Sequence, residues 1–237
     1  KMVFAYLFNG MLNAGLKEIF KAPRPIGLPG IRSLRLETAT GYSFPSGHTM
    51  YASSLWTSIM VQLKMRWIYL AGIFMIFLAA LSRVYLGVHF PADVIVGAIL
   101  SVAGVFISNW IFELVDYNGR KGLLLIYVIP VCLAGLFVHS GDYFKVLGAV
   151  VGFMGGYFTE TRYIHYDVKG ELWKQAVKYV IGIGVLLAIK VLVKSMLPAV
   201  PLSDFFRYFL LGAWGTAGAP VLFMRLFGKR STKCNEN

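Results

Sequence analysis

Residues 91–112 read PADVIVGAILSVAGVFISNWIF, and this stretch decides the fold class. It contains one charged residue, Asp93, and no strand-like alternation of polar and apolar positions. Pro91 suits the first turn of a helix. A backbone N–H in that turn has no acceptor inside the helix, so nothing is lost when proline lacks it. The run is long enough to cross the hydrocarbon core of a bilayer, which needs ~20 apolar residues. The stretch therefore predicts a membrane-spanning helix.

The rest of the chain repeats this pattern. Its 237 residues are 57% hydrophobic and only 14% charged, with a mean hydropathy of +0.66. A soluble domain of this size would carry about a quarter charged residues. We therefore expect an all-α, polytopic transmembrane helical bundle of about eight spans. These spans are predicted at residues 2–20, 46–63, 67–82, 91–112, 122–138, 143–158, 175–196 and 204–227, the last of them kinked by Pro220.

Three short polar motifs interrupt the apolar chain, and each lies at the ends of predicted spans. They are Lys17-x6-Arg24-Pro25, Phe44-Pro45-Ser46-Gly47-His48 and Ser82-Arg83-x5-His89-x3-Asp93. Counting spans along the chain brings all three motifs to one face of the membrane. The second motif opens a helix, whose first amide N–H groups lack intrahelical partners and whose dipole places positive charge at that end. The motifs therefore predict a phosphate-processing site at a membrane surface.

The three motifs resemble the signature of the type-2 phosphatidic acid phosphatase superfamily. The resemblance covers residues 17–93 and holds at every motif position. The superfamily contains integral-membrane lipid phosphatases, glucose-6-phosphatase-like enzymes and soluble vanadium haloperoxidases, and the apolar composition argues against the last of these. The resemblance implies a phosphatase core, expected in residues 1–113, and a C-terminal transmembrane extension in residues 114–237. Members usually have further spans ahead of the first motif, so we expect sequence to be missing before Lys1.

The motif residues suit the hydrolysis of a phosphate ester. This reaction requires an in-line nucleophile, a proton for the leaving group and positive charge around the equatorial oxygens. We expect His89 to be the nucleophile and to form a phosphohistidine, with Asp93 fixing the tautomer of its ring. His48 would be the general acid, because an imidazole titrates near neutral pH. The resemblance implies the same roles.

The remaining motif positions are expected to hold the phosphoryl oxygens: the cations Lys17, Arg24 and Arg83, the hydroxyl of Ser46 and the amide of Gly47. Ser46 fits the N-cap of the following helix equally well. Arg32 and Arg35 are expected to face lipid headgroups. The acidic residues are scattered, with no HExxH motif or paired carboxylates near the histidines, so we expect neither a metal nor a cofactor.

The net charge of +12 comes from cations that lie between the spans, so it does not indicate nucleic-acid binding. More of these cations lie opposite the motif face than on it. The opposite face has Lys64, Arg66, Arg120, Lys121, Arg162, Lys169, Lys174, Arg225, Lys229, Arg230 and Lys233. The positive-inside rule then predicts a multi-pass membrane protein whose active site faces away from the cytoplasm.

The leading hypothesis is a metal-independent membrane phosphatase that acts on a lipid phosphate or diphosphate, of the phosphatidate, isoprenyl diphosphate or sphingoid-base phosphate type. Two alternatives stay open: a glucose-6-phosphatase-like enzyme for a soluble phosphoester, and a non-catalytic lipid-phosphate binder or transporter. The loop 21–44 offers few polar side chains that could recognise a sugar, namely Glu37, Thr38, Thr40 and Ser43. The loop composition therefore favours a lipid substrate.

The C-terminal half carries none of the motifs. Its glycines Gly148, Gly152, Gly155 and Gly156 follow a small-residue spacing that favours close helix packing, within the chain or across a homodimer. Cys132 lies in an apolar run and Cys234 in the polar tail, so we expect no disulfide framework.

Overall fold

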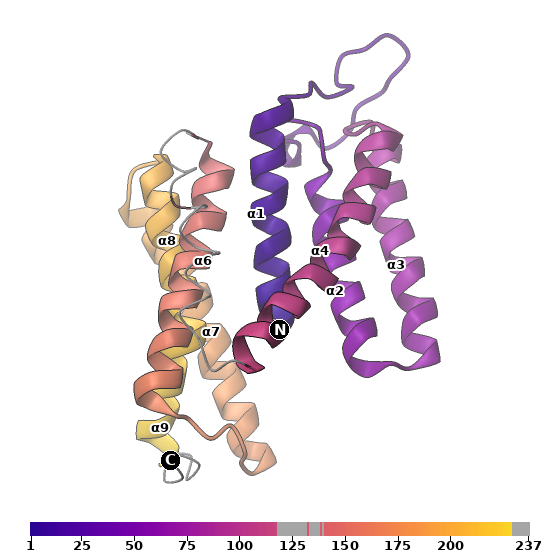
Figure 1. The fold of residues 1–237 in the computed structure, drawn as a ribbon. Helices are drawn as coiled ribbons and strands as arrows, with labels where there is room; N and C mark the ends of the chain where they lie inside the picture. Colours follow the sequence, from indigo (N-terminus) through magenta and orange to yellow (C-terminus); the bar gives the residue numbers. More distant parts are fainter. Residues whose placement is uncertain (118–131, 133–137, 139, 229–237) are drawn as a thin grey trace. The chain divides into compact units, whose positions relative to one another are not determined.

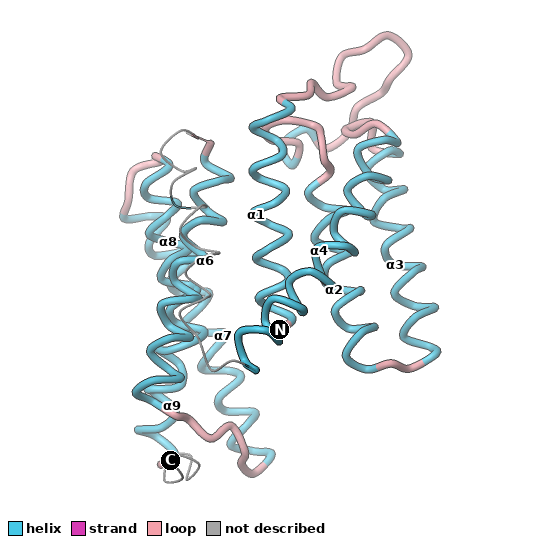
Figure 2. The backbone as a smooth tube through the Cα atoms, viewed as in Figure 1, coloured by secondary structure: helices cyan, strands magenta, loops and turns pink. Residues whose placement is uncertain are grey.

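The structure is a computed structural model that describes residues 1–117, 132, 138 and 140–228. These residues form helices and loops, with no β-strand among them (Figure 2), which confirms the all-α class. The chain has two compact units, Lys1–Arg120 and Lys121–Asn237. This boundary lies close to the division predicted between residues 113 and 114. The predicted span at 122–138 lies outside the described residues, apart from Cys132 and Val138.

The first unit contains four long helices (Figure 1). They are α1 (Met2–Phe20), α2 (Gly47–Leu63), α3 (Arg66–Tyr85) and α4 (Pro91–Tyr117). Their bounds agree closely with the first four predicted spans, although α4 extends past residue 112. The loop between α1 and α2 contains four prolines, Pro23, Pro25, Pro29 and Pro45, and one short 3-10 turn, Leu36–Thr38. Proline-rich sequence thus separates α1 from α2, as expected.

Helix α2 is the centre of the first unit, because it packs against α1, α3 and α4 more extensively than any other helix of this unit packs against its neighbours. Its enclosed surface is rich in hydroxyl groups. The buried residues of α2 are Thr49, Met50, Ser53, Ser54, Thr57, Ser58 and Met60. A helix that neighbouring helices shield from lipid can carry such side chains. On a lipid-facing helix each hydroxyl would be exposed to hydrocarbon, which is energetically unfavourable. The polar character of α2 is therefore a consequence of its central place.

Two asparagines of α1 hold the N-terminal half of α2 in place. Asn9 donates through Nδ2 to Ser54 Oγ (3.0 Å) and to the carbonyl of Ser101 in α4 (3.1 Å). Asn13 donates to the carbonyl of Pro45 at 3.0 Å. A Cβ atom on Gly47 would lie 3.1 Å from Asn13 Oδ1, so glycine allows this close approach. Helix α1 thereby fixes the turn that carries the second motif.

The second unit contains α6 (Gly141–Thr159), α7 (Leu172–Met196), α8 (Pro201–Ala213) and α9 (Ala219–Phe227). Two π-helical turns, Glu160–Ile164 and Trp214–Gly218, follow α6 and separate α8 from α9. The second turn interrupts the predicted last span directly ahead of Pro220, the residue expected to kink it. The helix predicted at 175–196 begins earlier, at Leu172.

The glycines of α6 pack against α8 within the chain. A Cβ atom on Gly148 or Gly152 would overlap the backbone carbonyls of Phe205 and Phe209, and one on Gly156 would overlap the hydroxyl of Thr216. Gly155 has no atom within 4 Å of such a Cβ. The predicted close helix packing is therefore intramolecular at three of the four glycines, and the homodimer stays a prediction.

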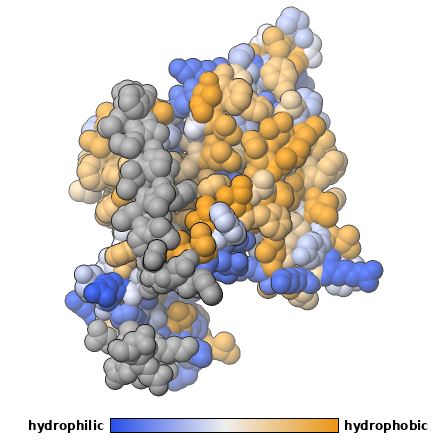
Figure 3. Space-filling model, in the orientation of Figure 1, coloured by the Kyte–Doolittle hydropathy of each residue, from blue (hydrophilic) through white to orange (hydrophobic). Residues whose placement is uncertain are grey.

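Four described helices are long and apolar enough to cross a membrane: Arg66–Tyr85, Pro91–Val115, Leu172–Met196 and the run Pro201–Phe227. Hydrophobic side chains cover much of the surface over the helices of the first unit (Figure 3). On α3 alone, Trp67, Leu70, Ile73, Phe74 and Phe77 are exposed. These helices indicate a multi-pass integral membrane protein. The prediction of about eight spans is not confirmed, since α1, α2 and α6 do not meet the same description.

Candidate active site

The N-terminus of α2 lies at the centre of the site. The amide of Met50 donates to the carbonyl of Ser46 at 3.0 Å, which begins the helical hydrogen-bond pattern. The amides of the three residues before Met50 have no acceptor inside the helix. The amide of Ser46 donates to the carbonyl of Asp93 at 3.1 Å and so ties this turn to α4. The helix end therefore leaves N–H groups without helical acceptors, which suits an anion, and phosphate binding by these amides stays a prediction.

Ser46 is fully buried at the position before α2, yet its side chain makes no capping hydrogen bond to the helix. Its Oγ atom instead accepts a hydrogen bond from Thr49 Oγ1 at 3.1 Å. Ser46 thus occupies the N-cap position, as expected, but its side chain does not cap the helix. A contact between the Ser46 hydroxyl and phosphate stays a prediction.

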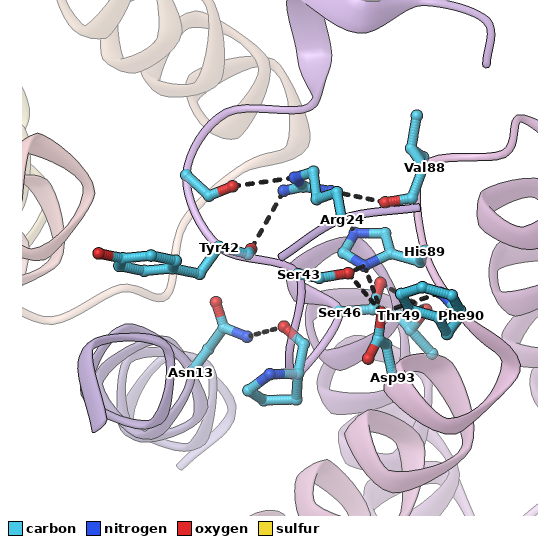
Figure 4. A network of polar contacts seen from close by, with 12 residues as sticks. Asn13, Arg24, Tyr42, Ser43, Ser46, Thr49, Val88, His89, Phe90 and Asp93 are labelled. Carbon is cyan, nitrogen blue, oxygen red and sulfur yellow. Dashed lines mark hydrogen bonds and ion pairs between the residues drawn. The ribbon is translucent and has the colours of Figure 1, made fainter. Parts of the chain in front are cut away.

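His89 and Asp93 form a buried pair, each with 4% of its surface exposed. Nδ1 of His89 lies 3.3 Å from Oδ2 of Asp93 (Figure 4). The same carboxylate oxygen accepts the amide N–H of Phe90, which precedes α4, at 2.9 Å. An acidic side chain in the first turn that reaches back to this amide stabilises the start of a helix. The start of α4 therefore holds Asp93 where it can orient His89.

Ser43 is a third member of this group, which the sequence analysis considered only for sugar recognition. Its Oγ atom lies 2.5 Å from Oδ2 of Asp93 and 3.3 Å from Nδ1 of His89, and the residue is fully buried (Figure 4). The one sequence signal for it is a hydroxyl residue just ahead of the second motif. Its contact partners lie 46 and 50 residues away in the chain, so only the fold brings them together.

Arg24 contacts both the loop ahead of α2 and the residues ahead of α4. Its guanidinium donates to the carbonyls of Thr40 (2.8 Å), Gly41 (2.9 Å), Tyr42 (3.3 Å) and Val88 (2.9 Å), and its Nη1 lies 3.0 Å from Nε2 of His89. An arginine has five N–H donors, and these five contacts engage all of them. Arg24 was expected to hold phosphoryl oxygens, and here it holds the loop and the imidazole. Phosphate binding by Arg24 stays a prediction.

The partners of His89 assign its tautomer. Nε2 faces an arginine, which can only donate, so Nε2 is the acceptor and Nδ1 carries the hydrogen. Burial is the main cause that lowers the pKa of His89 below its usual value. The charges of Arg24 and Lys17 lower this pKa further, while the hydrogen bond to Asp93 opposes them. His89 is therefore neutral at pH 7, with the lone pair on Nε2.

The other predicted residues gather around this pair. His48 is exposed at the start of α2, and its electrostatic neighbours are the cations of Arg83, Lys17 and Arg24 and the imidazole of His89. These residues come from α1, α3 and the two loops that flank α2 and α4. The structure thus brings all three motifs to one end of the first unit, as the span count predicted.

The loop ahead of α2 is tied to the turn after α3. The amide of Leu34 donates to the carbonyl of Leu86, and Ser33 Oγ donates to the carbonyl of Gly87, both at 2.9 Å. Gly87 has a φ of 63° and lies so close to Arg32 that a Cβ atom would come within 2.7 Å of the Arg32 carbonyl oxygen. The loop therefore packs beside the residues that lead into His89.

Across residues 1–117, 132, 138 and 140–228, no group of three His, Cys, Asp or Glu side chains could hold a metal ion. The positive charge of the site comes from lysine, arginine and a helix end.

Comparison with known proteins identifies the family. Residues 1–120 match the model of the PAP2 superfamily, which is the type-2 phosphatidic acid phosphatase superfamily. Residues 144–231 match the model described as the PAP2 superfamily phosphatase, transmembrane extension. No solved structure matched the chain.

Three curated relatives show the range of similar proteins. Undecaprenyl-diphosphatase of Sulfolobus acidocaldarius is 31% identical over 107 residues, which cover 45% of this chain and 52% of the relative. Sphingosine-1-phosphate phosphatase 1 of Rattus norvegicus is 27% identical over 172 residues, 66% of this chain and 40% of the relative. Phosphatidylglycerophosphatase B of Escherichia coli is 37% identical over 79 residues, 31% of this chain and 30% of the relative. The matched region thus spans about half of the first relative and less of the other two.

The resemblance read from the three motifs is confirmed by both family models. The superfamily model covers just over half of the chain and includes every residue of the site described above. The chain belongs to the PAP2 superfamily.

Proposed function

We propose that this protein is a membrane phosphatase that hydrolyses a lipid phosphate or diphosphate through a phosphohistidine on Nε2 of His89. The observation that carries the proposal is the placement of the His89 ring between Asp93 and Arg24. Its Nδ1 lies 3.3 Å from the Asp93 carboxylate, and its Nε2 lies 3.0 Å from the Arg24 guanidinium. A neutral imidazole held in this way is a nucleophile for phosphorus.

The first step of the proposed reaction transfers the phosphoryl group to the protein. The lone pair on Nε2 attacks phosphorus as the P–O bond to the leaving group breaks on the opposite side. His48 donates its proton to the departing oxygen. The amides at the start of α2, with Lys17, Arg24 and Arg83, stabilise the charge on the equatorial oxygens. For the attack, Arg24 Nη1 has to move from Nε2 to a phosphoryl oxygen.

The second step releases phosphate and restores the protein. Water attacks the phosphohistidine, and the neutral His48 accepts its proton as the P–N bond breaks. Asp93 stabilises the positive charge that develops on the imidazole in both steps, because Nδ1–H points at its carboxylate. The reaction consumes one water and returns both histidines to their starting protonation states. Phosphate charge is balanced by protein cations, so this reaction uses no metal.

A lipid substrate fits the composition around the site. The names of the relatives refer to undecaprenyl diphosphate, sphingosine 1-phosphate and phosphatidylglycerophosphate. The site lies at helix ends, the depth at which the headgroup of a lipid resides, and α3 beside it exposes apolar side chains along its length. A lipid could keep its chains in the bilayer while its phosphate enters the site. We propose that this site faces away from the cytoplasm, because more of the cations between the spans lie opposite the motif face than on it.

The test is phosphate release by the purified chain in matched detergent micelles. The panel contains a long-chain lipid phosphate, an isoprenyl diphosphate and glucose 6-phosphate. We expect kcat/KM for the better lipid to exceed that for the sugar phosphate by at least about tenfold, or about 1.4 kcal/mol in transition-state binding. Parity or a preference for the sugar phosphate would refute the lipid assignment. Binding of lipid phosphate without release would favour a non-catalytic binder.

A further inference from the structure

The hydroxyl of Ser43 closes a triangle with the nucleophile and its carboxylate. Ser43 Oγ lies 2.5 Å from Asp93 Oδ2, and both oxygens lie 3.3 Å from Nδ1 of His89 (Figure 4). A carboxylate can only accept, so the Ser43 hydroxyl donates to Asp93. Its lone pairs are then available to the Nδ1–H of His89. The Nδ1–H is therefore shared between two oxygens at equal distance.

The backbone holds Ser43 in this position from two sides. The amide of Ser43 donates to the carbonyl of Ala22 at 2.9 Å. The three residues before it are held through their carbonyls by the guanidinium of Arg24. The side chain has no exposed surface. A fully buried hydroxyl with a fixed backbone has little freedom, so its partners are fixed as well.

The 3.3 Å distance between Nδ1 and Oδ2 is long for a bond between an imidazole and a carboxylate. Asp93 alone therefore holds the ring weakly in this arrangement. Ser43 adds to this contact, because it orients the carboxylate with a hydrogen bond and offers Nδ1–H a second acceptor at the same 3.3 Å. A loss of either contact would let the imidazole turn about its side-chain torsions and move Nε2 off the line of attack.

We propose that Ser43 is a positioning residue of the His89–Asp93 pair, whose hydroxyl fixes the carboxylate and the Nδ1–H so that Nε2 points at phosphorus. The proposal rests on the proposed phosphatase function and adds to it. Ser43 neither touches the substrate nor exchanges a proton in either step. Its effect is on the orientation and basicity of His89.

The test compares Ser43→Ala with Ser101→Ala in the full chain, in detergent micelles. Ser101 is a matched control, because it is also fully buried in the first unit and donates its hydroxyl to a backbone carbonyl, that of Met50 at 2.7 Å. We expect Ser43→Ala to lower kcat by roughly 10- to 100-fold with KM unchanged, by analogy with the range found when the outer hydrogen-bond partner of a metal-ligating histidine is removed. Ser101→Ala should leave kcat unchanged per folded molecule.

The pH profile separates positioning from simple loss of folded protein. The charged and titratable groups that act on His89 and its surroundings are Lys17, Arg24, His48, Arg83 and Asp93. Ser43→Ala removes a donor to the Asp93 carboxylate, which raises the pKa of His89, and an acceptor of its Nδ1–H, which lowers this pKa. The acidic limb of kcat/KM should therefore move in Ser43→Ala and stay in place in Ser101→Ala.

Each outcome decides between the two proposals. A wild-type chain that releases no phosphate from any substrate overturns the proposed function. An active wild type with a Ser43→Ala variant that matches Ser101→Ala in kcat and in the acidic limb overturns the role of Ser43. If Ser43→Ala does not fold, Ser43→Cys fills the same space with a weaker donor and replaces it in the comparison. Wild-type kcat and pH profile in Ser43→Cys would equally overturn the role.

Discussion

Arg24 Nη1 lies 3.0 Å from Nε2 of His89, the ring nitrogen that faces away from Asp93. Arg24, which is expected to bind phosphate, thus contacts Nε2 of His89, the atom that is expected to attack phosphorus. Its other donors hold four backbone carbonyls on two loops. A phosphoryl oxygen that draws Nη1 away would uncover the lone pair of Nε2. Arg24 therefore couples the arrival of the substrate to the availability of the nucleophile in the proposed reaction.

Replacement of His89 should abolish activity completely. We expect His89→Asn to abolish multiple turnover of a lipid phosphate, because no other described imidazole is hydrogen-bonded to Asp93. His165→Asn is the matched control, since His165 contacts the carbonyl of Arg162 in the second unit and has a positive φ that asparagine tolerates. Phosphate release over many turnovers, measured in micelles, is the readout. Appreciable turnover by His89→Asn would remove it as the nucleophile.

Acid should inactivate the protein by protonating His89. Because its pKa lies below the usual value of 6.5, the acidic limb of kcat/KM should lie below pH 6.5. Arg24→Gln removes a neighbouring positive charge, so the pKa of His89 should rise and the limb should move to higher pH. Arg24→Lys keeps the charge and should leave the limb in place while lowering activity, because one ammonium cannot hold the carbonyls of both loops. Equal limbs in the two variants would contradict this reasoning.

Metal removal should leave the activity intact. Lys17, Arg24, Arg83 and the N-terminus of α2 supply the positive charge that the phosphoryl group needs, so turnover in a strong chelator should equal turnover without it. Vanadate should inhibit, since its trigonal-bipyramidal form resembles the transferring phosphoryl group. Initial rates with chelator, and with chelator plus added Mg²⁺, test the first expectation. Activity that is lost in chelator and restored by the ion would overturn it.

The packing of α6 on α8 predicts opposite behaviour for two glycines that lie close together in α6. In Gly152→Ala the new methyl group meets the carbonyl of Phe209, so one helix has to move and the variant should be destabilised by about 1–3 kcal/mol. In Gly155→Ala the methyl group meets nothing within 4 Å, and the variant should be as stable as the wild type or more so. Thermal unfolding in detergent is the measurement. Equal midpoints would show that α8 does not pack on this face.

The proposed orientation in the membrane can be tested within the first unit. Arg35 lies in the loop beside the site, and Arg66 begins α3 at the opposite end from Arg83. In a chain whose Cys132 and Cys234 are replaced by serine, we expect an impermeant thiol reagent to label Arg35→Cys in intact cells. Arg66→Cys should be labelled only after lysis. The reverse result would place the active site on the cytoplasmic face.

The sequence predicted most of the first unit because its signals are local. Apolar runs bounded by proline and glycine gave helices α1 to α4 to within a few residues, and the motifs at their ends gave His48, His89 and Asp93. Ser43 and the contacts of Arg24 could not be found in this way. They depend on how the loop folds between α1 and α2, and the partners of Ser43 are many residues away in the chain. A loop without periodicity carries no signal for such contacts.

The number of spans was harder to predict for a different reason. Hydropathy measures what faces lipid, and α2 faces other helices. Ser53, Ser54, Thr57 and Ser58 make α2 polar although it lies in the middle of the first unit. The sequence nevertheless predicted this helix, at 46–63, from its apolar residues and from the second motif, which marks its first residues. With 17 residues, α2 is also shorter than the helices that are long enough to cross a membrane.

The hydroxyl-rich surface of α2 also bears on how the protein is made. A helix that carries so many polar groups gains little from entering a bilayer alone, because each hydroxyl would meet hydrocarbon. We expect α2 to enter the membrane together with α1 and α3, which pack against it, and its buried hydroxyl groups to be covered when α4 has been synthesised. His48 lies on α2, the helix that has to be covered. His89 and Asp93 lie just before and at the start of α4, the last helix that covers it. Membrane insertion of α2 and assembly of the catalytic groups would then be a single event.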